Sequence, residues 1–171
     1  GDRLRSVLWV AACITFGGAA AMVAYDFLDL RNDPVVLIAI ISGGVLALVL
    51  WRLHPRALQH AAVFAALVIS IGVAVSMVPG PESEFYNPDA PPITEFMPGM
   101  AIWAVGLVWL MFSWAQQIRP PVLGMVLGAV VMILGAATFA SVAWGVYFAL
   151  ATVVAVIVLA VLMRNFFLLI V

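Results

Sequence analysis

The sequence contains no lysine, a single cysteine and few charged residues of either sign. Charged side chains make up 9% of its 171 residues, whereas a typical soluble domain has about 25%. No basic patch is present, which argues against nucleic acid as a partner. Cys13 alone can form neither an intrachain disulfide nor a CxxC pair, so we expect it to be a small packing residue.

Hydrophobic side chains dominate instead, at 67% of the total, whereas soluble domains have about 45–50% apolar residues. A soluble fold of this length must show a substantial polar surface, which so few charged residues cannot supply. The composition therefore predicts an all-α integral membrane protein, and the predicted location is the plasma (inner) membrane of a prokaryote.

The apolar runs predict a bundle of six transmembrane helices, because about 20 apolar residues are needed to cross a hydrocarbon core of about 30 Å. The predicted spans are about 7–25, 34–51, 57–78, 99–115, 121–140 and 143–163. The stretch 122–163 has no charge and would be about 60 Å long as one helix, so we divide it near Thr138–Ala143. The spans form a single polytopic domain.

The arginines predict the orientation of these helices. With six spans and a cytoplasmic N-terminus, all arginines except Arg31 lie on the cytoplasmic side, which is the positive-inside pattern. All acidic residues except Asp2 then lie on the opposite side. Both termini are expected in the cytoplasm, with three helices on each side of a central exoplasmic loop.

That loop, residues 79–98, is acidic and rich in proline. We expect its prolines, Pro98 included, to keep it free of regular structure. It is interpreted first as a solvated connector, and alternatively as a docking surface for a partner or as a weak Ca²⁺ site, since hard cations favour carboxylate oxygens. The candidate partner contacts are Glu82, Glu84, Tyr86, Asp89 and Glu95.

No predicted span has an ionisable residue in its interior. Such residues mark proton relays and ion paths, so their absence weighs against a proton pump or a carboxylate-coupled carrier. His54 and His60 are expected to be polar residues at the cytoplasmic interface, rather than haem ligands. No serine has a histidine or carboxylate at matching depth to activate it, so we expect no enzyme, no metal and no cofactor.

Small residues at four-residue spacing occur in three of the predicted helices, where they would allow helix backbones to approach closely. Packing within the chain is favoured over a binding face for another subunit. The candidate packing residues are Ala62, Ala66 and Ser70, then Gly124 and Gly128, then Ser141, Gly145 and Ala149.

These features favour a non-catalytic multi-pass membrane protein, an accessory or scaffolding subunit of a larger complex whose partners are the lipid bilayer and other membrane subunits. One alternative is a sensory or regulatory module with its cytoplasmic effector beyond Val171, an expectation motivated by the abrupt apolar end of the sequence. The other is a small-solute transporter, because three helices on each side of a loop give two halves of opposite orientation. A transporter would require a polar cavity at mid-membrane.

Overall fold

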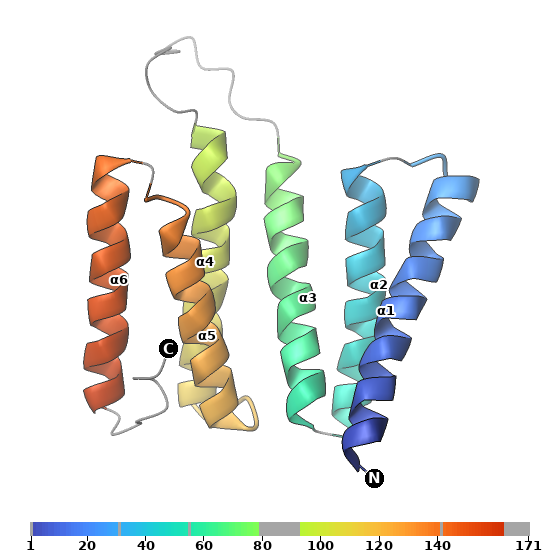
Figure 1. Cartoon of the computed structure of the whole chain (residues 1–171), viewed down its shortest axis with the longest axis horizontal. Helices are drawn as coiled ribbons and strands as arrows, with labels where there is room; N and C mark the ends of the chain where they lie inside the picture. The colour runs from blue at the N-terminus through green and yellow to red at the C-terminus, as the bar shows by residue number, and fades with distance from the viewer. Residues whose placement is uncertain (1, 31, 55, 79–92, 141, 163–171) are drawn as a thin grey trace. The chain divides into compact units, whose positions relative to one another are not determined.

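The computed structural model describes residues 2–30, 32–54, 56–78, 93–140 and 142–162 (Figure 1). Helices joined by short turns make up this part of the chain, and no strand occurs in it. The prediction of an all-helical protein is thus confirmed. The helices are α1 (Asp2–Phe27), α2 (Asp33–Leu53), α3 (Ala57–Ser76), α4 (Ile93–Trp114), α5 (Pro121–Ala137) and α6 (Ala143–Leu162).

Five of these helices are long and apolar enough to cross a membrane, namely all except α5. Helix α5 is apolar but has 17 residues, which at about 1.5 Å per residue make it about 25 Å long. The predicted span over 121–140 is therefore longer than the helix, because the chain leaves helical geometry after Ala137. The next helix begins at Ala143, so the break lies where the sequence suggested a turn.

Helix α4 begins at Ile93, six residues before the predicted start of the fourth span at Gly99. Residues 93–98 are therefore helical, and the expectation that Pro98 lies in an extended loop is wrong. Pro98 is the sixth residue of α4, so the helix lacks the backbone hydrogen bond that a non-proline residue there would donate to the carbonyl oxygen of Thr94.

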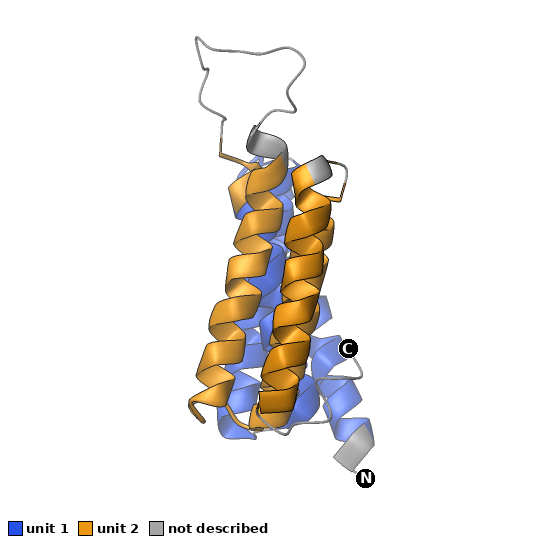
Figure 2. Cartoon of the chain, turned by 90° about the vertical axis from the view of Figure 1, so that its left-hand side faces the viewer, with its two compact units in different colours: residues 1–74 blue, residues 75–171 orange. Residues whose placement is uncertain are grey.

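The chain divides into two compact units, residues 1–74 and residues 75–171, which Figure 2 shows in different colours. In the first unit, α1 packs antiparallel to α2 through small residues. A Cβ atom added to Gly17 would lie 2.5 Å from the carbonyl oxygen of Ala39, and one added to Gly43 would lie 2.8 Å from that of Cys13. The two backbones are therefore in direct contact, and Cys13 is buried there as expected.

In the second unit, α4 and α5 pack antiparallel through four glycines. A Cβ atom on Gly106 would lie 2.7 Å from the carbonyl oxygen of Gly128, and one on Gly135 would lie 2.9 Å from that of Gly99. Within each helix the two glycines are seven residues apart, so they share a face. Close backbone approach of this kind is how membrane helices gain packing energy where hydrophobic drive is weak.

Helix α6 completes the second unit. Leu110 of α4, Met125, Ala129 and Met132 of α5, and Val156 and Ala160 of α6 form one buried cluster. The indole Nε1 of Trp103 donates a hydrogen bond of 3.2 Å to Oγ1 of Thr152, and this hydroxyl donates to the carbonyl oxygen of Phe148 at 3.0 Å. Both polar groups are thereby satisfied inside the helix bundle.

Candidate functional site

A groove in the first unit is lined by residues of α1, α2 and α3. Its volume is about 460 Å³, within the range of about 300–1,000 Å³ typical of small-molecule sites. Nearly all of its lining is apolar. The lining residues come from three helices: Val10, Cys13, Ile14, Gly17 and Gly18 of α1; Ala39, Ile40, Gly43, Gly44 and Ala47 of α2; and Ala62, Ala65, Ala66 and Ile69 of α3.

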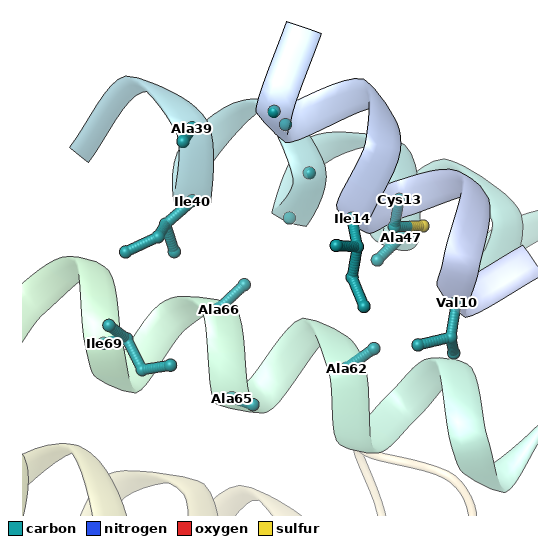
Figure 3. Close-up of a pocket in the computed structure, with 14 residues that line it drawn as sticks. Val10, Cys13, Ile14, Ala39, Ile40, Ala47, Ala62, Ala65, Ala66 and Ile69 are labelled. Carbon is teal, nitrogen blue, oxygen red and sulfur yellow. The ribbon is translucent and has the colours of Figure 1, made fainter. Parts of the chain in front are cut away.

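Small side chains create this space. Figure 3 shows Val10 and Ile14 of α1 facing Ala62 of α3 across the groove. A Cβ atom added to Gly18 would meet nothing within 4 Å, so this glycine borders open space. By contrast, a Cβ atom on Gly44 would lie 2.8 Å from the Cβ of Ala66, where α2 and α3 touch. The small residues that let these helices touch therefore also line the groove.

At one end of the groove, each of the three helices carries a residue with a polar group one turn beyond its lining residues. Residues three or four positions apart lie on the same helix face. Ser6 therefore lies one turn before Val10 on α1, Trp51 one turn after Ala47 on α2, and Gln59 one turn before Ala62 on α3. With Arg56, these residues form what we call the polar end: Ser6, Trp51, Arg56 and Gln59.

Arg56 is held in place at the polar end. Its guanidinium Nη1 donates a hydrogen bond of 3.1 Å to Oγ of Ser6, and its Cζ lies 5.4 Å from the ring centroid of Trp9. A cation over an indole face is attracted by the ring's negative quadrupole. Because Ser6 and Trp9 are on α1, these contacts tie the start of α3 to α1.

Two histidines, both expected to be interfacial, pack on tryptophans beside the polar end. The ring of His54 lies 4.9 Å from that of Trp9 in an edge-on arrangement, and His60 stacks on Trp51 at 5.1 Å. His60 is buried and His54 is exposed. These ring contacts fix the orientation of Trp51 at the end of α2.

Gln59 is the most unusual residue of the polar end. It is 1% exposed, and its amide oxygen and nitrogen are both buried without a hydrogen-bond partner among the described residues. The indole Nε1 of Trp51 is also buried without such a partner. A buried polar group left without a hydrogen bond costs about 1–3 kcal/mol, so the polar end has an unmet capacity for hydrogen bonds.

The candidate packing residues are distributed over several environments. Ala62 and Ala66 line the groove, whereas Ser70 lines a shallower hollow of about 340 Å³ between α2 and α3. Gly124 is buried, and Gly128 packs against Gly106. Gly145 is buried against the backbone of Phe139, and Ala149 is half-buried. Ser141 lies outside the described residues.

Most of the candidate acidic contacts fall in the segment 79–92, between α3 and α4 in the sequence. Glu82, Glu84, Tyr86 and Asp89 lie outside the described residues, and of Glu95 only the helical backbone is described. Among the side chains that are described, no group of three or more His, Cys, Asp or Glu residues could hold a metal ion. The connector, partner and Ca²⁺ interpretations of the acidic loop stay predictions.

Sequence reasoning missed the glycine pairs Gly99 with Gly135 and Gly106 with Gly128. Their signal is a seven-residue spacing, at positions 99, 106 and 113 of α4 and 128 and 135 of α5, which a four-residue pattern does not detect. It also missed Gln59 and Trp51, which look like ordinary interfacial residues. Counting three or four positions outward from the small residues of each helix would have aligned these polar residues on one face.

A comparison with known proteins gives no matching family model, no matching curated protein and no matching solved structure. The inferences below therefore depend on this chain's own residues.

Proposed function

We propose that the protein is a non-catalytic, multi-pass membrane protein that serves as an accessory or scaffolding subunit of a larger membrane complex. The observation that carries this proposal is the direct backbone contact between Gly106 and Gly128 in the second unit. It supports a rigid pair of helices with no room for a solute between them. The buried hydroxyls nearby, on Ser113 and Thr152, are used in hydrogen bonds to backbone carbonyls.

The exposed face of α6 supports a role in assembly. Large apolar side chains recur on it at alternating spacings of three and four residues, the pattern of a helix-packing seam. The residues are Tyr147, Leu150, Val154, Ile157 and Val161, and each is between 46% and 74% exposed. In a membrane such a seam suits another apolar helix as well as lipid.

The transporter alternative receives less support. It requires polar contacts at mid-membrane, and the groove of the first unit is lined there by glycine, alanine and isoleucine.

We further propose that all six helices cross the membrane with both termini in the cytoplasm. The arginines and the apolar composition of α5 support this arrangement, although α5 is shorter than the others.

Purification of the full-length protein from its native membrane in mild detergent, followed by mass spectrometry, tests the proposed role. The expected result is one or more membrane subunits in fixed stoichiometry with this chain. Replacing Leu150 and Val154 together by alanine should reduce their recovery, whereas alanine at Leu162, which is exposed on α6 but outside this seam, should not. Purification of the chain alone, at every mild-detergent condition that keeps it folded, would contradict the proposal.

A further inference from the structure

We propose that the groove of the first unit binds an acyl chain of an anionic phospholipid, whose headgroup lies at the polar end against Arg56, Gln59 and Trp51. This inference does not depend on the protein being a subunit of a complex, because it concerns residues of one unit only. It accounts together for the apolar groove, for the buried polar atoms of Gln59 and Trp51 that have no hydrogen-bond partner among the described residues, and for the arginines at that end.

The length and lining of the groove suit an acyl chain. The lining residues extend over nine positions on α1, from Val10 to Gly18, and the eight steps between them correspond to about 12 Å. Nearly all of the lining is apolar, as the burial of a hydrocarbon chain requires.

The groove is open on one side, so a lipid can enter it laterally. Ile14 is 70% exposed and Ile69 is 50% exposed, although both line the groove. Cys13 and Ala47 are buried and line the same groove, so the groove has a closed side and an open side. An acyl chain lying there would contact apolar atoms along its whole length.

The polar end offers the hydrogen-bonding groups that a phosphodiester headgroup requires. Phosphate oxygens are acceptors, and Nε1 of Trp51 and Nε2 of Gln59 are buried donors without partners among the described residues. The amide oxygen of Gln59 is an acceptor, which suits a hydroxyl group on the headgroup. A phosphatidylglycerol headgroup carries both kinds of group, and the guanidinium of Arg56 is the neighbouring cation.

Charge at this end favours an anionic lipid over a zwitterionic one. The start of α1, the end of α2 and the start of α3 carry four arginines and one acidic residue, namely Arg3, Arg5, Arg52, Arg56 and Asp2. Basic pockets between membrane helices on the cytoplasmic side bind anionic lipid headgroups. This is also the side on which the positive-inside pattern places these arginines.

Native mass spectrometry of the purified full chain tests the proposal. The chain is delipidated and titrated with phosphatidylglycerol or phosphatidylcholine that have identical acyl chains. We expect phosphatidylglycerol to bind in a one-to-one complex at least about fivefold more tightly, which is the effect of about 1 kcal/mol from one arginine near the membrane surface. Equal affinity for the two lipids would overturn the proposal.

Matched variants locate the bound lipid. Gly18→Leu fills open space in the groove and should weaken the binding of both lipids, whereas Ala19→Leu, on the adjacent exposed residue outside the groove, should not. Arg56→Gln and Gln59→Leu should lower the preference for phosphatidylglycerol, and Arg52→Gln, which removes an exposed arginine at the same end, should lower it less. Circular dichroism and the thermal midpoint establish that each variant is folded.

A photo-crosslinking residue at Ala65, which lines the groove, distinguishes the possible occupants in membranes. Capture of phospholipid supports the proposal. Capture of a second copy of the chain or of another membrane protein in place of lipid would make the groove a protein interface and would overturn it. Unchanged lipid binding by Gly18→Leu would also overturn the proposal, because it would show that the acyl chain binds outside the groove.

Discussion

Gly106 and Gly128 each lie against the other's backbone across the contact between α4 and α5. A Cβ atom on either glycine would lie 2.7 Å from the carbonyl oxygen of the other. Neither position can therefore accept a methyl group unless the helices move apart. The contact explains why these two helices lie so close together.

Gly128→Ala should destabilise the second unit. Overpacking a tight interior costs about 1–3 kcal/mol, and the better helix propensity of alanine returns at most about 1 kcal/mol. The free energy of unfolding, measured by denaturant titration in mild detergent, should fall. Gly18→Ala is the control, because its new methyl group meets nothing within 4 Å. Equal stability of Gly128→Ala and the unmodified protein would show that the helices are not in backbone contact.

Gly17→Ala should loosen the contact between α1 and α2. Its Cβ atom would lie 2.5 Å from the carbonyl oxygen of Ala39, one turn from buried Cys13. Because Cys13 is the only cysteine, its rate of labelling by N-ethylmaleimide reports on this contact. We expect faster labelling in Gly17→Ala and no change in Gly18→Ala. Identical rates in the two adjacent variants would contradict the packing described for this helix pair.

The hydrogen bond from Trp103 to Thr152 should contribute modestly to stability. Side-chain hydrogen bonds between membrane helices average about 0.6 kcal/mol, with a maximum of about 1.7 kcal/mol. A double-mutant cycle of Trp103→Phe and Thr152→Val should give a coupling energy in that range. Thr152→Val also removes the bond to the carbonyl oxygen of Phe148, so its single effect should exceed the coupling. A coupling energy near zero would show that the two side chains do not interact.

The sequence predicted helices well because the apolar runs are long and the charges between them are few. It did not predict where α4 begins, because Glu95 and Pro98 resemble loop residues and a proline inside a helix, as Pro98 is in α4, is disfavoured. The groove was also beyond sequence reasoning. Whether a small residue such as Gly18 or Gly17 borders open space or a neighbouring backbone depends on how far apart the helices lie, and that distance is set by residues on the other helices.

The pairing of buried Gln59 with the groove illustrates the same limit. From the sequence, Gln59 is one polar residue in the interfacial stretch around His54 and His60, where solvation would be the ordinary expectation. The structure buries it to 1% exposure and leaves its amide without a partner among the described residues. Burial is a property of the assembled helices, so the spacing of Gln59 from Ala62 can indicate its helix face but not that its amide is buried.

Cysteine accessibility tests whether the short helix α5 crosses the membrane. In a Cys13→Ala background, single cysteines are placed at Leu28, Gln117 and Ala140, all exposed residues in or beside the turns. An impermeant maleimide applied to intact cells should label the cysteines that replace Leu28 and Ala140. The cysteine that replaces Gln117 should be labelled only after the cells are disrupted. We expect α5 to cross because none of its 17 residues is charged, so no charged side chain keeps the helix at the membrane surface. Local thinning of the bilayer can accommodate so short a helix at a cost of fractions of a kcal/mol per Å of mismatch. Labelling of Gln117 and Ala140 from the same side would show that α5 re-enters instead of crossing, and would move α6 and the C-terminal residues to the opposite orientation.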